Sequence, residues 1–409
     1  MPLASRDQVP LRRSRDLVIV AAGQAISALG NTVAATTLLL YMQAHGRTSW
    51  AVAGVLAAEM VPLVLFAPLA GMIVDRLDSR LLIVVASGWQ AAACVGLALC
   101  TSLPLVFPLV FAVGCGSALA GPTFSALLPR IAGEERIAAA ASLLATSTGI
   151  AAMAGPGLAG LLYGASGLRL PFFVDAASFL AVTAAAFLVR TRRKVVLDSA
   201  KSAPRMRDGL TSVLANRVVR SMVLMLAAFV VVGEATNVVE VYFVRKTLGQ
   251  SATTYGLLGT VFTFSLLAGS ALAGRWNGDR QLVRAVSGSG FVLAAALALL
   301  AIVPTIGWVF AVFVVFGAAN GVINVSSSAL LIRATPEPER GRVLAAFSGI
   351  ARAAGLGALV LGGALASAFS PRHVVGMCGL AALATLAVTL PPLLRTVPTI
   401  DRAELSVAP

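Results

Sequence analysis

The sequence has few charged residues, few cysteines and few histidines, and each shortage excludes a class of protein. Only 12% of its 409 residues are charged, whereas about 25% is usual in soluble domains. The four cysteines, Cys94, Cys100, Cys115 and Cys378, all lie in apolar runs and lack the spacing of metal ligands. The two histidines stand in short loops without acidic or cysteine neighbours. We therefore expect packing cysteines, no metal site, and a chain that does not fold as a soluble domain.

Hydrophobic residues are abundant, in contrast, and are arranged in long runs. They make up 58% of the chain. The net charge of +14 would suggest nucleic-acid binding in a soluble protein. Here, however, the charges form short groups between apolar runs of about 20 residues, the length that spans a bilayer as a helix. The sequence therefore predicts an integral membrane protein whose surroundings are a lipid bilayer, with no nucleic-acid partner.

Charged residues, proline and glycine divide the chain into twelve expected membrane spans, so the expected fold class is an all-α integral membrane protein. The spans cover residues 17–42, 51–74, 81–101, 105–128, 138–163, 171–189, 219–243, 253–273, 283–303, 307–332, 343–367 and 374–394. The expected domains are an N-terminal segment (1–16), a six-helix half (17–189), a solvated basic linker (190–218), a second six-helix half (219–394) and a tail (395–409).

The distribution of lysine and arginine predicts the orientation. An even number of spans puts both termini on one side of the membrane, and that side carries 25 of the 31 basic residues. The opposite side carries five, and Arg352 lies inside a span. Short loops rich in Lys and Arg stay in the cytoplasm. We therefore expect a multi-pass protein of the cell membrane with cytoplasmic termini, linker and tail.

The two expected halves resemble each other in sequence. The string GIAAMAGPG from Gly149 matches GIARAAGLG from Gly349, and SALLPR from Ser125 matches SALLIR from Ser328. The string LAG occurs at the end of the second span of each half. Because each half has an even number of spans, both copies enter the membrane in the same direction. The sequence therefore predicts two parallel repeats of six helices.

A short charged loop separates the second and third expected spans. The string GMIVDRLDSR contains Gly71, Asp75, Arg76, Asp78 and Arg80. Fixed charges cost roughly 3 kcal/mol or more each in hydrocarbon, so this loop must lie at a membrane face. We expect Gly71 to let a neighbouring helix approach closely. The loop resembles the hallmark loop of the major facilitator superfamily of transporters, although an ordinary positively charged loop would also fit these ten residues.

Other strings extend this resemblance to almost the whole chain. GQAISALGN, PLAGMIVDRLDSR, FSALLPRIAGEER, AGPGLAG and FFVDAASF follow one another through the first half. They resemble the drug and siderophore exporter branch of the superfamily, which includes macrolide and enterobactin exporters. The resemblance implies two six-helix halves that alternate in access. The sequence departs from the superfamily pattern at two places: Asp78 stands where the pattern usually has glycine, and the fourth span lacks the arginine that many drug/proton antiporters carry there.

Gly155, Pro156 and Gly160 resemble the antiporter motif of the fifth helix. Proline removes one backbone hydrogen bond, and the flanking glycines permit close packing and a bend. A purely structural bend and a direct role in exchange both remain open.

Polar side chains inside the spans are candidate functional residues, because they are costly in a membrane. Three groups share helix faces: Gln24, Ser27 and Asn31 on the first helix, Glu234 and Asn237 on the seventh, and Asn320 and Asn324 on the tenth. The resemblance implies that the first, fourth, seventh and tenth helices surround the central cavity. The alternative for each residue is interhelical hydrogen bonding.

Four further charged residues lie within spans. Asp175 and Glu240 are expected near the outer interface, where water can solvate them. Arg352 is about 15 Å from the cytoplasmic end of the eleventh helix, and Glu59 is about 13 to 14 Å below the outer surface on the second. Their depths coincide, so we expect a salt bridge between the two halves. Alternatively, each faces a watery cavity separately, or Arg352 pairs with backbone carbonyls.

A second contact between the halves is expected at the charged loop. Asp75 would lie at the start of the eleventh helix, near Gly341 and Arg342, where free N–H groups and the helix dipole favour a carboxylate by roughly 0.3 to 2 kcal/mol. This contact would act as a cytoplasmic latch.

The sequence contains no phosphate-binding glycine loop, nucleophile elbow or plausible catalytic histidine, so we do not expect an enzyme. The expected function is proton-coupled efflux of a small amphipathic drug, antibiotic, siderophore or other secondary metabolite. A cavity with a few amides and one carboxylate fits such cargo better than sugars or phosphates. No cofactor is expected beyond the proton gradient, and the protein is expected to be a monomer. The alternatives are an importer or facilitator on the same fold, and a non-transporting membrane receptor or scaffold.

Overall fold

The computed structural model describes residues 15–45, 48–100, 102–133, 136–191, 206–215, 217–276, 278–302 and 305–405. Most of the predicted N-terminal segment, residues 192–205 and 216 of the predicted linker, and the last four residues of the predicted tail lie outside these ranges. The described residues form helices and short connections, and no strand occurs among them. The all-α prediction is therefore confirmed.

The chain divides into two compact units. Unit 1 comprises Met1–Tyr41 and Ala58–Ser199, and unit 2 comprises Met42–Ala57 and Ala200–Pro409. This division differs from the predicted halves in one respect, because residues 42–57 belong to unit 2.

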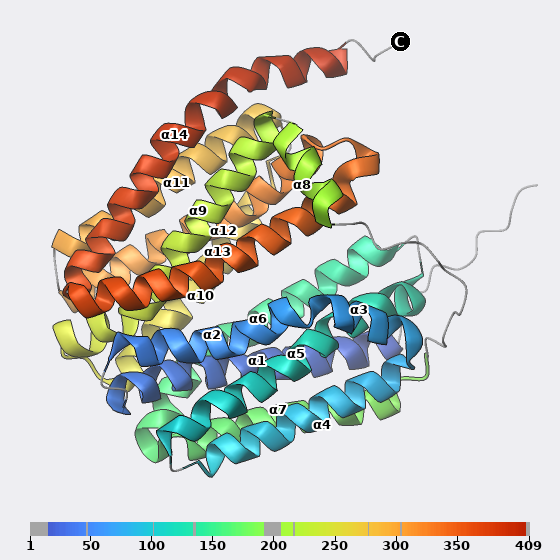
Figure 1. The fold of residues 1–409 in the computed structure, drawn as a ribbon, viewed down its shortest axis with the longest axis vertical. Coiled ribbons are helices and arrows are strands. Elements are labelled where there is room, and N and C mark those ends of the chain that lie inside the picture. Colours follow the sequence, from blue (N-terminus) through green and yellow to red (C-terminus); the bar gives the residue numbers. More distant parts are fainter. Residues whose placement is uncertain are drawn as a thin grey trace, which may run out of the picture. The chain divides into compact units, whose positions relative to one another are not determined.

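Among the described residues, seven helices precede the linker (Figure 1). They are α1 (Arg15–His45), α2 (Ser49–Leu65), α3 (Ala67–Arg76), α4 (Ser79–Ala98), α5 (Leu103–Ala132), α6 (Ile137–Ser166) and α7 (Arg169–Leu188). Within unit 1, α4 packs against both α5 and α7. Buried Ile83, Leu127, Val182 and Ala186 form a core between these three helices.

The predicted second span is bent rather than continuous. Helix α2 ends at Leu65, and the axes of Ser49–Leu65 and Leu69–Arg76 differ by 57°. Pro68 stands in the first turn of α3. Proline is tolerated there because the first N–H groups of a helix have no intrahelical partner, but its ring would clash with the carbonyl four residues earlier in a continuous helix. Two successive helices are the result.

In the second part of the chain, the described residues form seven α-helices and two short helices of other types. They are α8 (Met206–Ala215), α9 (Arg217–Tyr242), the π-helix η3 (Phe243–Thr247), α10 (Ala252–Ala273), α11 (Asp279–Ile302), α12 (Ile306–Arg333), the 3₁₀ helix η4 (Glu337–Glu339), α13 (Arg340–Ala368) and α14 (Pro371–Leu405). Helix α8 lies in the predicted solvated linker, yet Val213 is buried in the core of unit 2 beside Met222 and Leu282. This part of the linker is therefore a packed helix. Helix α14 continues past the predicted end of the last span, to Leu405.

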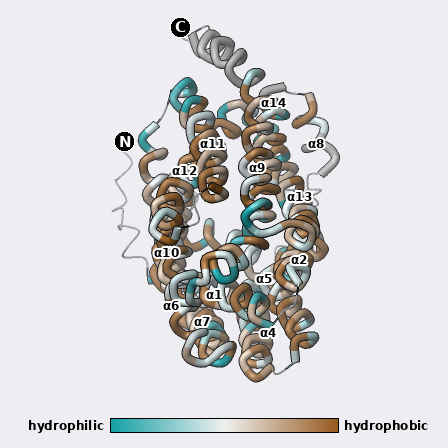
Figure 2. Tube along the Cα trace, turned by 90° about the vertical axis from the view of Figure 1, so that its left-hand side faces the viewer, coloured by the Kyte–Doolittle hydropathy of each residue, from teal (hydrophilic) through white to brown (hydrophobic). Residues whose placement is uncertain are grey.

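Among the described residues, ten single helices are long and apolar enough to cross a membrane, and α2 with α3 makes an eleventh if the bent pair is one span. The 30-residue α6 coincides with the predicted fifth span. Hydrophobic segments predominate along the long helices of both units (Figure 2). A helix that is hydrophobic on most sides needs a protein core or lipid around it. The chain is therefore a multi-pass membrane protein, and the predicted number of twelve spans stays a prediction.

Glycine at the repeated LAG strings has different surroundings in the two units. A Cβ on Gly269 would collide with the backbone carbonyl of Ala318, so glycine is needed where α10 crosses α12. A Cβ on Gly71 would meet no atom of the described residues within 4 Å. The tight helix contact therefore occurs at Gly269, and the close approach of a neighbouring helix to Gly71 stays a prediction.

Candidate functional site

A pocket in unit 1 is lined by the polar stripe predicted on the first helix. Gln24, Ser27 and Asn31 all face it from α1, as their three- and four-residue spacing requires. Helices α4, α5, α6 and α7 supply the other walls. The free volume is about 440 Å³, within the range of roughly 300 to 1,000 Å³ that is usual for small-molecule sites. We call this space the polar pocket.

The other polar side chains in the polar pocket are neutral hydrogen-bonding groups, accompanied by two aromatic rings. The groups are Ser87, Gln90, Ser117, Ser125 and Thr148, with Phe124 and Phe179. Gln90 is only 2% exposed, and its amide nitrogen donates to Ser117 Oγ at 3.0 Å and to the Val113 carbonyl at 3.4 Å. Sequence reasoning missed Gln90, although Ser87 lies three residues earlier on the same face of α4 and both side chains line the pocket.

A smaller cavity lies next to the polar pocket in unit 1. Its polar lining is Asn31, Glu59, Cys94 and Asp175, and its free volume is about 20 Å³. About 10 to 15 Å³ of such volume is enough for one water molecule. We call it the acidic chamber. Asn31 lines both cavities, so a single side chain of α1 stands between them.

Asp175 is buried in the acidic chamber, which corrects the expectation that water solvates it near the outer interface. The residue is 1% exposed. The Cys94 thiol donates to Asp175 Oδ2 at 3.3 Å, and Ser178 Oγ lies 3.1 Å from Oδ1 and 2.7 Å from the Asp175 carbonyl oxygen. The prediction used only distance along the helix, whereas neighbouring helices cover this side chain. Glu240, the other residue of that pair, is half-buried on α9.

Glycine at position 30 lets α1 approach Asp175 closely. A Cβ on Gly30 would lie 2.5 Å from Asp175 Oδ1 and would also collide with Ser178. Real Cβ atoms do not come so close to a neighbour, so a larger residue here would force α1 and α7 apart. The backbone of α1 is therefore packed directly on the buried carboxyl group, one residue before Asn31.

The glycine and proline motif of α6 forms a second close contact with α1. A Cβ on Gly155 would lie 2.6 Å from the Cβ of Thr32. Gly160 is buried, and α6 continues through Pro156 as one helix from Ile137 to Ser166. The close-packing role of Gly155 is therefore visible in the structure, while the predicted bend and any role in exchange stay predictions.

The charged loop between α3 and α4 is short, and Asp78 caps the following helix. Asp78 Oδ1 accepts from the backbone N–H groups of Arg80 at 2.8 Å and Leu81 at 3.3 Å. These N–H groups have no partner within the helix, so a side-chain acceptor stabilises its start. The departure from glycine at this position therefore has a structural reason. The Arg80 guanidinium also donates to the carbonyl of Val189, after the end of α7.

The predicted cytoplasmic latch and the predicted salt bridge each join a residue of unit 1 to a residue of unit 2. Asp75 and Arg76 are exposed on α3 in unit 1, whereas Gly341 and Arg342 belong to unit 2. Glu59 belongs to unit 1 and Arg352 to unit 2. The cytoplasmic latch and the salt bridge between the halves therefore stay predictions.

An unpredicted carboxylate anchors the end of unit 1 at the start of the linker. Asp16 of α1 accepts the backbone N–H of Thr191 at 2.8 Å and its hydroxyl at 2.6 Å, together with the N–H of Arg190. The N-terminal turn of α1 is thereby joined to the segment that follows α7.

The polar stripes predicted for unit 2 form contacts within their own helices. Asn237 Nδ2 lies 3.4 Å from Glu234 Oε2 on α9. On α12, Asn324 Nδ2 donates to Asn320 Oδ1 at 2.7 Å and to its backbone carbonyl at 3.0 Å. Each pair therefore shares a helix face, as its spacing predicted.

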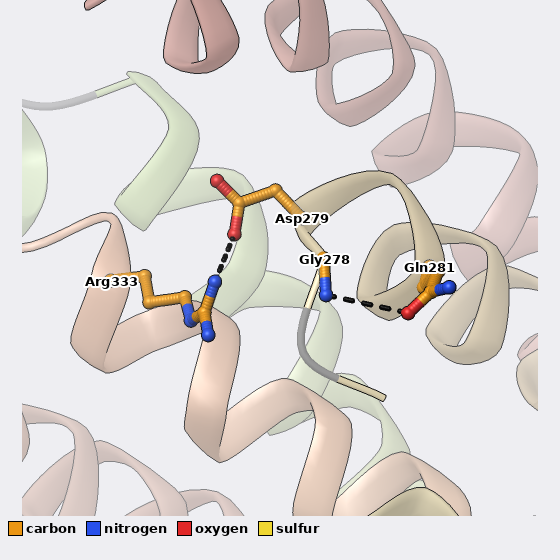
Figure 3. A network of polar contacts seen from close by, with 4 residues as sticks. All are labelled: Gly278, Asp279, Gln281 and Arg333. Atoms are coloured by element: carbon orange, nitrogen blue, oxygen red, sulfur yellow. Dashed lines mark hydrogen bonds and ion pairs between the residues drawn. The ribbon is translucent and has the colours of Figure 1, made fainter. Parts of the chain in front are cut away.

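Sequence reasoning also missed an ion pair between α11 and α12. Arg333 Nη1 lies 3.0 Å from Asp279 Oδ1, and the backbone N–H of Gly278 donates to Gln281 Oε1 at 3.4 Å (Figure 3). The Asp279 side chain is 6% exposed and that of Arg333 is 42% exposed. Arg333 is the last residue of the SALLIR string, which matches SALLPR in the first half. The sequence repeat therefore marked this arginine as a candidate for a structural role.

Residues 42–57 pack on α9, η3 and α13 within unit 2. Ser49 Oγ donates to the Gly363 carbonyl at 2.9 Å, and the Tyr242 hydroxyl donates to the Thr48 carbonyl at 3.1 Å. Arg245 Nε donates to Gln43 Oε1 at 3.3 Å. These bonds explain why the chain divides at positions 41 and 57.

The described part of the chain contains no group of three or more His, Cys, Asp or Glu residues that could hold a metal ion. The polar pocket of unit 1 offers hydrogen-bonding groups, and the acidic chamber offers the carboxyl groups of Glu59 and Asp175.

The chain is similar in sequence to a known efflux protein over about three quarters of its length. The chain is 21% identical over 309 residues to macrolide efflux protein A of Streptococcus pyogenes, covering 74% of this chain and 76% of the relative. The same protein from the serotype M6 strain ATCC BAA-946 / MGAS10394 gives the same values.

Solved transporter structures share the fold. A POT family transporter in complex with 5-aminolevulinic acid has a TM-score of 0.76 at 12% identity and covers 94% of this chain and 96% of its own. The nucleoside transporter NupG has a TM-score of 0.72 at 14% identity, with coverage of 92% and 100%. An inward-facing, unoccupied bacterial homologue of the human lysosomal transporter Spinster has a TM-score of 0.69 at 14% identity, with coverage of 98% and 99%.

The sequence profile of one family, described as transmembrane secretion effector, matches residues 8–408. The long apolar helices, the polar pocket between them and the shared transporter fold agree with this match. The chain is a membrane transporter rather than an enzyme, and it belongs to the transmembrane secretion effector family of the major facilitator superfamily.

Proposed function

We propose that this protein exports a small amphipathic organic compound from the cell in exchange for protons. The polar pocket carries this proposal, because it combines amide and hydroxyl groups with two phenylalanine rings inside a membrane unit. Such a lining binds a molecule that has both hydrogen-bonding groups and an apolar surface. The macrolide efflux relative supports export and a cargo of this kind. We place the protein in the cell membrane with both termini in the cytoplasm.

Energy for transport comes from the proton gradient in this proposal. Carboxyl groups within membrane segments are the natural proton carriers, since a charge there must be neutralised by a proton or a cation. Glu234 is one candidate, and the pair of Glu59 and Arg352 is another. Protonation of Glu59 would weaken a salt bridge to Arg352 and so favour opening between the halves.

Efflux assays in cells test the proposal. Cells that express the protein are loaded with macrolides, dyes or siderophores, and retention is followed with and without a proton uncoupler. We expect lower retention than in cells without the protein, and loss of the difference with the uncoupler. Higher accumulation in expressing cells would favour import on the same fold and overturn export. No effect across the panel would favour the receptor alternative.

A pair of variants connects the assay to the pocket. Gln90→Ala removes a buried amide that bonds to Ser117 and lines the polar pocket. Gln281→Ala removes an amide at the start of α11, outside the pocket. We expect Gln90→Ala to weaken efflux and Gln281→Ala to leave it near the wild-type rate at equal expression. Equal effects of the two variants would remove the pocket from the proposal.

A further inference from the structure

A second small cavity lies next to the polar pocket in unit 1. Helices α1, α4, α5 and α7 line it, together with the residues that directly follow α7, and its free volume is about 20 Å³. One water-sized particle needs about 10 to 15 Å³ of such volume, so the cavity has room for one small group. We call it the apolar slot, because most of its walls are aliphatic: Val20, Ile83, Leu127, Ala185, Ala186 and Val189.

Three side chains form the boundary between the apolar slot and the polar pocket, because they line both spaces. They are Gln24 of α1, Phe124 of α5 and Val182 of α7. Gln24 and Phe124 are half-buried, and a change of rotamer moves such side chains without moving their helices. A group attached to a molecule in the polar pocket can therefore reach the apolar slot past these two side chains.

Small residues keep the apolar slot open between α1 and α7. Gly23 lines the slot and has no side chain, and a Cβ at this position would lie 3.2 Å from the Cβ of Ala185. Ala186, the next residue of α7, is also short. An aliphatic space of this size lacks the polar partners that hold a water molecule in place. An apolar group that enters it therefore displaces no firmly bound water.

Polar groups that already have partners close the far end of the apolar slot. The Arg80 guanidinium donates to the carbonyl of Val189, and the Thr191 hydroxyl donates to Asp16 Oδ2 at 2.6 Å. An alkyl chain that reached this end would desolvate the guanidinium, which is unfavourable. Val182 at the boundary and Val189 near the far end are seven residues apart, about 10 Å along a helix. The slot therefore accepts an apolar group of limited length.

We propose that the apolar slot binds a short alkyl substituent of the cargo while the polar part of the same molecule lies in the polar pocket, and that Gly23 sets the size of the substituent. This inference rests on the proposed export function and narrows its cargo class. The preferred cargo carries a methyl, ethyl or similarly short alkyl group next to a hydrogen-bonding group, which Gln24 can contact at the boundary. Gly23 is then a specificity-determining residue.

The first test needs no cargo, because xenon binds in empty apolar cavities. Crystals of the wild-type protein under xenon pressure should contain xenon in the apolar slot. Gly23→Ala adds one methyl group to the wall and should remove this xenon, whereas Gly164→Ala should keep it. Gly164 is the matched control in the same unit, since a Cβ there would meet no atom of the described residues within 4 Å. A wild-type slot without xenon, or equal occupancy in Gly23→Ala, would overturn the proposal.

The second test measures binding of the methyl, ethyl and butyl esters of tetramethylrhodamine to purified protein by fluorescence anisotropy. Each CH₂ group that enters an apolar site raises affinity about fourfold. We expect the ethyl ester to bind the wild type about fourfold more tightly than the methyl ester, with no further gain for the butyl ester. Gly23→Ala should remove the preference for ethyl, and Gly164→Ala should retain it. The same preference in wild type and Gly23→Ala would show a packing void only and overturn the proposal.

A variant that lengthens the apolar slot should change the preference in the opposite direction. Val189→Ala removes two methyl groups near the far end, so we expect the butyl ester to bind this variant more tightly than the ethyl ester does. An unchanged order of the three esters would contradict the predicted limit on length. If no ester binds to the wild type, the proposed function fails for these dyes, whereas xenon that is present in the wild type and absent in Gly23→Ala still supports the slot.

Discussion

The ion pair between Asp279 and Arg333 leads to an asymmetric prediction, because its two members differ in exposure. Asp279 has 6% of its side chain exposed and Arg333 has 42%. Removing the arginine leaves a buried carboxylate without its partner, whereas removing the carboxylate leaves an arginine that water can solvate. We therefore expect Arg333→Gln to destabilise unit 2 considerably more than Asp279→Asn.

The magnitudes follow from the cost of each orphaned group. Breaking a fully buried pair by removing one partner costs about 3 to 5 kcal/mol, and exposed pairs contribute about 0 to 1 kcal/mol. Because Arg333 is partly solvated, we place Arg333→Gln between these limits, at about 1 to 3 kcal/mol. Asp279→Asn should cost less than about 1 kcal/mol, because its amide can still accept from Arg333.

Thermal unfolding with a thiol-reactive dye can measure this difference in unit 2 alone. Cys378 is a buried free cysteine of α14, and the other three cysteines can be replaced by serine or alanine. The dye then reports when unit 2 opens. Arg340→Gln is the control, since Arg340 donates to the backbone carbonyls of Ile332 and Thr335. Equal losses of Tm for Arg333→Gln and Asp279→Asn, or the reverse order, would refute the reasoning from exposure.

Three further changes test contacts of the two units. Gly155→Leu should destabilise the protein by about 1 to 3 kcal/mol, because its side chain must displace Thr32; an unchanged Tm would contradict the close contact. Asp75→Asn should abolish efflux while the protein stays folded in the membrane, and full efflux would remove the cytoplasmic latch. Arg352→Ala should impair transport, because it removes the cation that the predicted salt bridge gives to Glu59. The charge-swapped double variant, Glu59→Arg with Arg352→Glu, should recover part of the transport rate. A double variant that transports no faster than Arg352→Ala would argue against the salt bridge.

The helices and one wall of the polar pocket were predictable from the sequence for simple physical reasons. A long apolar run that crosses a bilayer forms a helix, because a helix satisfies its backbone hydrogen bonds within the same segment. The i, i+3, i+7 spacing of Gln24, Ser27 and Asn31 puts them on one face whatever the rest of the fold does. Local spacing was therefore sufficient for α1, and the structure places all three residues in one pocket.

The acidic chamber was not predictable in the same way, because it depends on contacts between helices far apart in the sequence. Depth along α7 suggested that Asp175 is solvated, but its burial is decided by Gly30 of α1 and Cys94 of α4. The bend at Phe66 had a local signal in Pro68. Reading residues 51–74 as a single apolar run gave that proline too little weight.

The glycine-mediated contact of α1 with α7 brings the two helices close enough for an engineered disulfide bond. Such a bond would test whether unit 1 moves as a rigid body during transport. A Cβ at Gly23 would lie 3.2 Å from the Cβ of Ala185, slightly closer than the roughly 3.5 to 4.5 Å that a disulfide requires. Cysteines at these two positions would therefore fasten α1 to α7 after a shift of a few tenths of an ångström. Transport by rigid units would survive such a crosslink, whereas transport that needs α1 to shift over Asp175 would stop until the bond is reduced.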